Sequence, residues 1–390
     1  MAQWNRVPLI DYIELIGGGT PKTTVPEYWN GNIPWLSVKD FNNDKRYVYS
    51  TEKHISQSGF ENSPTKMLHK DDIIISARGT VGEIAMIPFD MAFNQSCYGI
   101  RASRGIDQPF LYYLLKNCIS QLKRMTHGSV FDTITRDTFA NIEVDIPDAE
   151  TQKRISSVLA DIDNKIEVND AINDNLYEIV NAYYTSLFKD VECEMTTIGN
   201  YAERIYSGGT PTTSNAAYWD GTFGWFSSGE TRNRFVISTE KSITQTGIDN
   251  SSTKLASKHD IVMASAGQGF TRGQTSMLLI DTYVNQSVIV IHADRNILPY
   301  LFWNLANRYE ELRAISDSSS IRGSLTTKMI AAFEIPCANN DVIQTFSGFA
   351  WAVIPQIENN LLENERLAAL RDSLLPKLMT GEIDVSAIQL

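Results

Sequence analysis

The side chains with the most chemical potential in this sequence are polar or aromatic, and they occur twice. A Gly-Gly-Thr-Pro run containing Thr20 is followed by Tyr-Trp and a further tryptophan, and the same series returns around Thr210. The triplet Asn-Gln-Ser also recurs, at residues 94–96 and 285–287. Threonine, asparagine and glutamine can hydrogen-bond to base edges and phosphates, and loops often present such contacts. The pattern suggests two binding surfaces of one kind, although the same residues also suit turns and core packing.

Motifs of the common catalytic classes are missing from the sequence. It has no Walker loop, no Gly-x-Ser-x-Gly, no His-Glu-x-x-His and no Asn-Pro-Pro-aromatic tetrapeptide of amino-methyltransferases. The glycine runs before Thr20 and Thr210 lack the Gly-Lys-Ser/Thr ending of a phosphate loop and are interpreted as turns. The five histidines do not share equivalent places in the two halves, whereas a duplicated enzyme should duplicate its catalytic residues. We therefore predict a chain without catalytic residues.

Composition indicates an ordinary globular protein of two or three domains. The chain has 390 residues, 43% of them hydrophobic, and no apolar run long enough to cross a membrane. Its N-terminus has charges inside its apolar run, so it does not resemble a signal peptide. Four widely separated cysteines predict neither a disulfide framework nor a metal site, and they favour a reducing, cytoplasmic location.

The net charge of −12 argues at first against a nucleic-acid partner, which is bound mainly by lysine and arginine. The net charge is −2 for residues 1–148, −4 for 149–190, −2 for 191–340 and −4 for 341–390. The two larger segments are thus nearly neutral. Each has enough cations for a basic face, and the sequence does not show whether it forms one.

The repeat divides the chain into a globular segment, a long helix, a second globular segment and a second long helix. We place these parts at residues 1–148, 149–190, 191–340 and 341–390, and each globular segment closes on Ile-Pro. Short strand candidates, such as 72–77, 82–87, 261–264 and 287–291, accompany one helix in each half, near 108–126 and 298–315. This predicts an α+β fold with two pseudo-symmetric, mostly-β domains separated by two long antiparallel coiled-coil helices.

Residues 149–198 contain no glycine or proline before Gly199, which is typical of one long helix. Apolar residues alternate at steps of four and three from Ile155, as in a coiled-coil seam, and the same pattern returns 191 residues later. Gly348, Pro355 and Pro376 should kink or break the second helix. The seam positions expected to pair, or to bind partners, are Ile162, Ile166, Asn169, Asn173 and Leu176 with Ile357, Asn360, Asn364 and Leu367.

Two asparagines hold equivalent positions in the seam. Polar seam residues fix the register of a coiled coil at some cost in stability. Asn169 is therefore expected to face Asn360 near a pseudo-two-fold axis. The alternative, partly exposed asparagines where the helices splay, is equally compatible with the sequence.

The ordered repeat resembles the specificity subunit of type I restriction-modification systems over essentially the whole chain. The resemblance rests on the Gly-Gly-Thr-Pro and Tyr-Trp series with Trp35 and Trp225, the Ile-Pro exits into long helices, and the C-terminal stretch at 372–383. It implies two target-recognition domains, each of which reads one half of a split, asymmetric double-stranded DNA site. It also implies two methyltransferase (modification) subunits docked on the helices, and restriction or translocase subunits. S-adenosylmethionine, ATP and magnesium would then belong to those partners, and this chain would hold no cofactor.

The halves differ in the loops where base reading is expected. Residues 76–82 read Ser-Ala-Arg-Gly-Thr-Val-Gly, whereas 264–269 read Ala-Ser-Ala-Gly-Gln-Gly. A common frame with different polar tips suits two readers of two sequences. The candidate DNA-binding residues are Thr20, Lys22, Thr23, Lys39, Arg78 and Thr80 in the first half and Thr210, Thr212, Arg232, Arg234, Gln268 and Arg272 in the second.

Two other classes of protein remain compatible with the residues. An enzyme acting on DNA would need a methyltransferase or nuclease signature. A non-catalytic adaptor, with two aromatic-rich domains that grip a protein or glycan, is favoured by the acidic charge.

Overall fold

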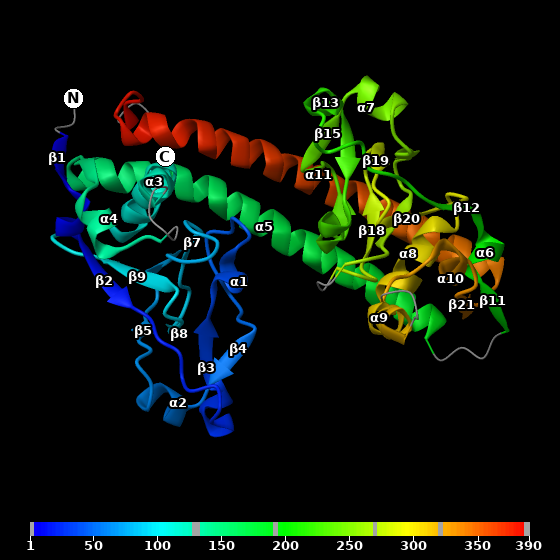
Figure 1. The fold of residues 1–390 in the computed structure, drawn as a ribbon, viewed down its shortest axis with the longest axis horizontal. Helices are drawn as coiled ribbons and strands as arrows, with labels where there is room; N and C mark the ends of the chain where they lie inside the picture. Colours follow the sequence, from blue (N-terminus) through cyan, green and yellow to red (C-terminus); the bar gives the residue numbers. More distant parts are fainter. Residues whose placement is uncertain (1–3, 127–132, 190–193, 268–270, 319–322, 386–390) are drawn as a thin grey trace. The chain divides into compact units, whose positions relative to one another are not determined.

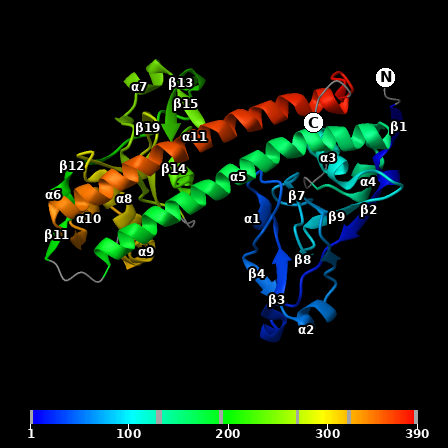
Figure 2. The same cartoon turned by 180° about the vertical axis from the view of Figure 1, so that it is seen from behind.

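A computed structural model describes residues 4–126, 133–189, 194–267, 271–318 and 323–385. The chain divides into two compact units, residues 1–167 with 366–390 and residues 168–365. Each unit therefore contains one globular segment and a part of both long helices. These helices are α5 (Ala149–Phe188) and α11 (Asn340–Met379) (Figure 1 and Figure 2).

The first unit contains two four-stranded sheets and a two-stranded ribbon. The sheet orders are β2-β9-β6-β7 and β4-β3-β8-β5, and β1 pairs with β10. The strands are β1 (Asn5–Pro8), β2 (Ile13–Gly17), β3 (Trp29–Leu36), β4 (Lys53–Ile55), β5 (Met67–Leu68), β6 (Ile73–Ser76), β7 (Ile84–Met86), β8 (Met91–Phe93), β9 (Cys97–Ala102) and β10 (Glu143–Ile146). The helices are η1 (Leu9–Tyr12), η2 (Pro26–Tyr28), α1 (Val38–Phe41), α2 (Gln57–Glu61), α3 (Gln108–Thr126) and α4 (Arg136–Ala140). The predicted strands at 72–77 and 82–87 and the predicted helix at 108–126 are confirmed.

The second unit repeats this arrangement. Its sheets have the orders β12-β20-β17-β18-β14 and β15-β13-β19-β16, and β11 pairs with β21. The strands are β11 (Met195–Thr197), β12 (Ala202–Ser207), β13 (Trp219–Phe226), β14 (Phe235–Val236), β15 (Lys241–Ile243), β16 (Lys254–Ala256), β17 (Ile261–Ala264), β18 (Thr275–Leu278), β19 (Thr282–Val284), β20 (Val288–Ala293) and β21 (Glu334–Pro336). The helices are α6 (Ile198–Tyr201), η3 (Ala216–Tyr218), η4 (Ser228–Arg232), α7 (Gln245–Asp249), α8 (Leu298–Ala306), α9 (Tyr309–Ser318) and α10 (Thr327–Ala331).

The single helix predicted at 298–315 is wrong, because the chain forms two helices there. α8 ends at Ala306, and the side-chain amide of its C-cap residue Asn307 donates to the carbonyl of Trp303 at 2.8 Å. Arg308 then donates to the carbonyl of Glu334 at 2.6 Å. These bonds turn the chain between the fully buried α8 and the amphipathic α9.

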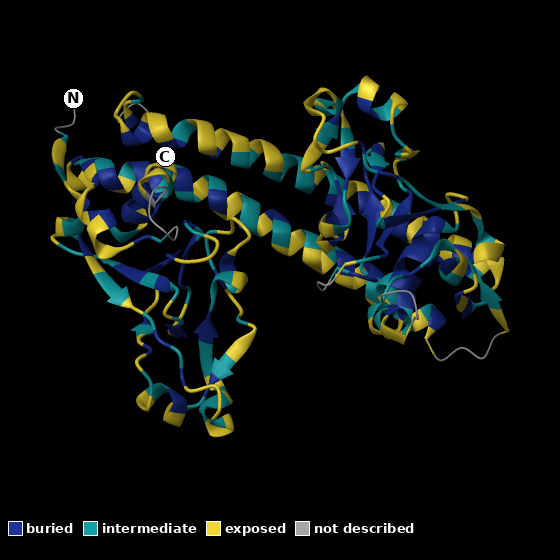
Figure 3. Ribbon diagram, viewed as in Figure 1, coloured by how far each residue is buried: buried dark blue, intermediate teal, exposed yellow. Residues whose placement is uncertain are grey.

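Each unit builds its main core between one sheet, its internal helices and its parts of α5 and α11 (Figure 3). In the first unit, Ile155 and Leu159 of α5 and Leu378 of α11 pack against the aromatic residues of α3. In the second, Tyr184 of α5 and Phe346 of α11 pack against α8. A smaller core lies between the two sheets of each unit. The long helices are therefore part of both folding cores.

The long helices differ from their predicted limits. α5 ends at Phe188, so the glycine-free run to residue 198 is not helical throughout, and β11 follows within it. α11 is continuous through Gly348, Pro355 and Pro376, so the predicted interruption is wrong. The buried residues Ile354 and Ile357 beside Pro355 anchor that helix in the core, and this packing offsets the lost backbone hydrogen bond.

The asparagines of the seam pair across the helices, but not as predicted. The Asn169 amide donates to Asn364 at 2.9 Å and to Glu363 at 2.8 Å, while Asn360 donates to Asn173 at 2.8 Å. Asn169 does not face Asn360. The helices run antiparallel, so Asn169 meets Asn364, which is the repeat equivalent of Asn173, and Asn360 meets Asn173. The two pairs are equivalent to each other at the 191-residue offset. Asn169 and Asn360 are both buried, so the splayed alternative is also excluded.

An ion network links the helices in the first unit; Arg371 and Asp163 are buried in it, whereas the Asp44 side chain is exposed. Arg371 contacts Asp163 at 2.9 Å and Asp44 at 3.0 Å, and the Tyr113 hydroxyl donates to Asp163 at 2.6 Å. Partial desolvation opposes ionisation of Asp44, but its ion pairs with Lys116 and Arg371 outweigh it and lower the pKa of that carboxyl. At the places in the second unit equivalent to Arg371 and Asp163, the long helices carry the apolar residues Val180 and Ile354.

We predict that Arg371→Ala destabilises the first unit by about 3–5 kcal/mol, because it leaves the Asp163 carboxylate buried without its partner. The matched control is the double variant Asp163→Ile with Arg371→Val, which copies Ile354 and Val180 of the second unit. The double variant should lose much less free energy of unfolding than Arg371→Ala. Urea unfolding of the full chain measures both, and equal losses in the two variants would contradict this account.

Candidate nucleic-acid interface

In the first unit, two tryptophans hold the loop that follows β2. Trp35 donates from its indole Nε1 to the carbonyl of Gly19 at 3.1 Å, and Trp29 donates to the carbonyl of Lys22 at 3.2 Å. The two rings meet edge to face at 5.3 Å. The Thr20 hydroxyl donates to the side chain of Gln95. The Thr-Pro motif thus fixes a loop whose next residues, Lys22 and Thr23, are exposed.

The second unit repeats these contacts residue by residue. Trp225 donates to the carbonyl of Gly209 and Trp219 to that of Thr212, both at 3.2 Å. Their rings meet edge to face at 5.0 Å. The Thr210 hydroxyl donates to Gln286. The duplicated threonines, glutamines and tryptophans therefore form a frame that fixes the loop after β2 and the equivalent loop after β12. In these two framed loops, exposed residues differ between the units, as Lys22 and Thr212 do.

Close backbone packing explains the glycines of the motif. A Cβ on Gly19 would lie 2.4 Å from the backbone nitrogen of Thr65. A Cβ on Gly208 would lie 1.9 Å from the carbonyl oxygen of Val284. Only glycine fits these positions. The runs begin at the ends of β2 and β12, and the turns of the loops lie later, at 23–24 and 213–214, so the interpretation of the runs themselves as turns is not confirmed.

The predicted binding residues fall into three groups. Lys22, Thr23 and Thr212 are exposed on the framed loops, and Arg78 and Thr80 are exposed on the turn between β6 and β7. In the part of the chain that the structure describes, the Arg78 side chain has no ion pair. These five side chains are available to a ligand.

Other candidates are engaged within the protein. Lys39 lies 4.0 Å from Glu52, and Arg232 pairs with Glu240, both at the surface. The hydroxyls of Thr20 and Thr210 are held by the glutamines of the frame, so these threonines shape the loops.

Two arginines of the second unit have structural positions. Arg272 is buried, pairs with Asp317 and donates to the carbonyl of Gly323 at 2.6 Å. Arg234 lies 3.3 Å from Asp174 and stacks at 4.2 Å on the ring of Tyr177, both on α5. Base reading by either would require these contacts to break. Gln268 lies outside the described residues.

Sequence reasoning missed a second duplicated contact. Arg101 binds the buried Asp72 at 2.6 Å and lies 3.6 Å from Glu14, while His292 binds the buried Asp260 at 2.5 Å. The carboxylates also accept from the main chain at the start of each turn. The signal was present in the sequence as the repeated Asp-Ile pairs at residues 72 and 260, but the change from arginine to histidine concealed the partner.

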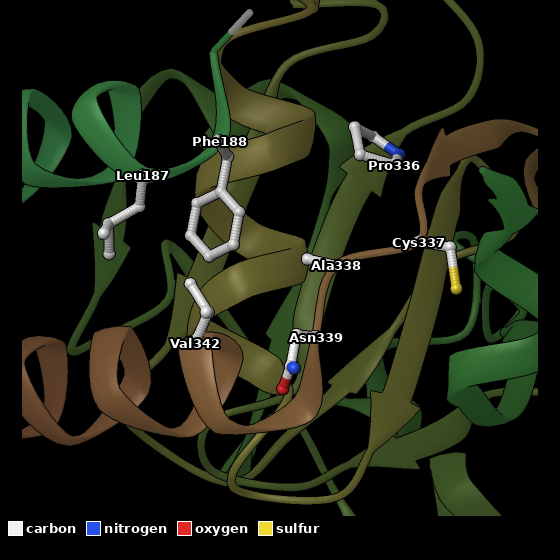
Figure 4. A pocket seen from close by; sticks show the side chains of 7 residues that line it. All are labelled: Leu187, Phe188, Pro336, Cys337, Ala338, Asn339 and Val342. Carbon is white, nitrogen blue, oxygen red and sulfur yellow. The ribbon is translucent and has the colours of Figure 1, made fainter. Parts of the chain in front are cut away.

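An apolar cavity of about 260 Å³ lies in the second unit (Figure 4). It is lined by Leu187, Phe188, Pro336, Cys337, Ala338, Asn339 and Val342. The Asn339 side chain accepts from the backbone of Asp341 at 2.8 Å, which leaves a wall of mainly apolar groups. The cavity offers little to bases or phosphates and does not belong to the candidate interface.

The described residues hold no group of three histidine, cysteine, aspartate or glutamate side chains placed for a metal ion. Among the helices of the described part of the chain, none is long and apolar enough to cross a membrane.

The family model of the type I restriction modification DNA specificity domain matches residues 1–178 and 191–341. The chain therefore belongs to the family of type I restriction-modification specificity subunits. The resemblance inferred from the repeat is thus confirmed. Each match contains one framed loop and one set of duplicated tryptophans.

Relatives cover the chain almost end to end. It is 23% identical to the type I restriction enzyme MjaIX specificity subunit of Methanocaldococcus jannaschii, over 99% of this chain and 94% of the relative. It is 22% identical to the HindI specificity subunit of Haemophilus influenzae, over 70% and 77% of the two chains. The crystal structure of an S subunit from M. genitalium has the same fold, with a TM-score of 0.56, 14% identity and coverage of 97% and 96%.

We predict that Trp35→Phe loosens the first loop while leaving its aromatic packing. The buried Gly19 carbonyl would lose its indole donor, which costs about 1–3 kcal/mol. Hydrogen exchange should increase in residues 19–25 but not in the equivalent loop of the second unit. Trp225→Phe is the matched control and should give the reverse pattern; faster exchange in both loops from either change would show that the frames are not independent.

Proposed function

We propose that the chain is the sequence-specific DNA recognition subunit of a type I restriction-modification complex, in which each globular segment reads one half of a bipartite, asymmetric site. The observation that supports this most strongly is the pair of identical loop frames with different exposed tips. A fixed frame positions side chains for base contacts, and a different set of tips selects a different sequence. The first reader would use Lys22, Thr23, Arg78 and Thr80, and the second would use Thr212 and its neighbours.

The chemistry of the complex would reside in other subunits. The sequence lacks the motifs of methyl transfer and of ATP hydrolysis. S-adenosylmethionine, ATP and magnesium would accordingly be bound by methyltransferase and translocase–nuclease partners. This chain would be non-catalytic, act in the cytoplasm, and direct those partners to a DNA site.

We further propose that the long helices carry the methyltransferase docking faces. Val168, Ile172 and Ile179 are 52%, 40% and 54% exposed, and steps of four and seven residues place them on one face of α5. On α11, Leu370 is 47% exposed and is equivalent to Ile179. Exposed apolar stripes commonly mark protein interfaces. The two helix segments each have a net charge of −4, which suits a partner face with basic residues around an apolar centre.

Arg78→Ala should change one half of the methylated sequence. An arginine that reads a guanine edge contributes about 1–3 kcal/mol of discrimination, so its loss should relax a position in that half alone. Sequencing of methylated DNA from cells that express the variant with its methyltransferase gives the motif. Arg104→Ala, an exposed arginine paired with Asp11, is the control and should leave the motif intact. Relaxation in both halves would contradict separate readers.

Ile179→Asp and Leu370→Asp should each remove one methyltransferase subunit, because each buries a charge at one of two equivalent docking faces. Native mass spectrometry of the assembled complex should show one copy instead of two for either variant, and none for the double variant. Thr246→Asp, an exposed change on α7, should retain both copies. Two bound copies in the double variant would place the docking faces elsewhere.

A further inference from the structure

Few lysines or arginines occupy equivalent positions in the two globular segments and also lack an ion pair with a carboxylate in the described parts of the chain. Arg46 and Arg234 are equivalent, but both are tied to α5, by Glu167 and Asp174. Lys70 and Lys258 are equivalent, yet Lys258 is paired with Glu358 at 2.6 Å. Repetition of a cation therefore often reflects a structural contact.

Lys66 and Lys254 are also equivalent and exposed, but only the pair Lys53 and Lys241 lies over the tryptophans of the loop frames. Both lysines of that pair are exposed, at the first position of the equivalent edge strands β4 and β15. Within the described parts of the chain neither forms an ion pair. The preceding glutamates, Glu52 and Glu240, are occupied by Lys39 and Arg232. Each unit thus keeps one lysine at this point without a carboxylate to neutralise it.

In each unit, the lysine ammonium group lies over the indole ring of the loop-frame tryptophan, in a cation–π contact. Lys53 Nζ lies 5.7 Å from the ring centroid of Trp29, and Lys241 Nζ lies 5.7 Å from that of Trp219. These are the same rings that donate to the carbonyls of Lys22 and Thr212. The cation is therefore positioned beside the exposed loop by the element that also shapes that loop.

Lysine is a compact, strongly hydrated charge that suits a phosphate contact, and it can also contact a guanine edge. A residue that selects a sequence should differ between the two readers, as Arg78 does from its counterpart. A residue that grips the DNA backbone can be the same in both. Identity, exposure, aromatic support and freedom from carboxylates together favour the second role.

We propose that Lys53 and Lys241 are the sequence-independent phosphate contacts of the two readers, one for each half-site. This inference rests on the proposed function, since it names how the same surface grips double-stranded DNA. Each ammonium neutralises one backbone phosphate next to the framed loop. The residues that differ then select the bases.

The test uses the complete complex with its methyltransferase and compares Lys53→Met, Lys241→Met and the double variant. Methionine keeps an apolar stem beside the tryptophan and removes the charge. We expect the slope of log affinity against log salt to decrease by about one for each single variant and about two for the double variant. The loss should be equal for cognate and non-cognate duplexes, and the methylation motif should not change.

Two controls separate charge from folding. Lys53→Arg should restore the slope, and Lys328→Ala, an exposed lysine whose repeat counterpart is Asp137, should not change it. An unchanged slope in the double variant, with DNA still bound, would overturn this proposal alone. An altered motif would overturn it too, because it would make these lysines base readers. A wild-type complex that binds no DNA would instead overturn the proposed function.

Discussion

The structure depends on one register between α5 and α11. Asn169, Asn173, Asn360 and Asn364 place amides in a seam that is otherwise largely apolar. A buried amide without a partner costs about 1–3 kcal/mol, so a shift of the helices by one turn would leave several such groups unsatisfied. Apolar residues alone tolerate sliding far better than paired amides do. Once the register is set, each unit can place its own apolar residues from both helices beneath its sheet.

The two repeats keep the same backbone geometry, while the side chains that make equivalent contacts differ. Asp72 and Asp260 make the same turn, but one is bound by an arginine and the other by a histidine. The helix contact made by Arg371 and Asp163 in the first unit is replaced by Val180 and Ile354 in the second. A buried ion pair and a well-packed apolar pair of similar volume can have comparable stability. The core therefore tolerates divergence, provided that both partners change together.

Local and periodic features were accessible from the sequence, and tertiary partners were not. The repeat, the start of α5 at Ala149 and the helix at 108–126 follow from spacing and punctuation. Pro355 misled the prediction of α11 because local propensity ignores the core that holds the helix. The prediction that Asn169 faces Asn360 was wrong because equivalent residues of two antiparallel helices meet only where they lie on the pseudo-two-fold axis.

The candidate site shows the same limit. Sequence types correctly drew attention to loops with threonine, lysine and arginine, but they could not show which side chains were already occupied. Arg272 and Arg78 look alike in the sequence; one is buried against Asp317, and the other is exposed. The availability of a charge is a property of its neighbours.

The acidic composition of the whole chain therefore says little about the charge of the candidate nucleic-acid interface. Several surface cations are paired with carboxylates of the same chain, as Lys39, Arg232 and Arg234 are. Such pairs contribute little field at a distance of more than a Debye length, about 8 Å at physiological salt. What a polyanion meets locally is the set of unmatched cations, such as Lys22 and Lys53 in the first unit and Lys241 in the second. The two long helical segments carry −4 each, so the net charge of −12 does not describe the surroundings of these cations.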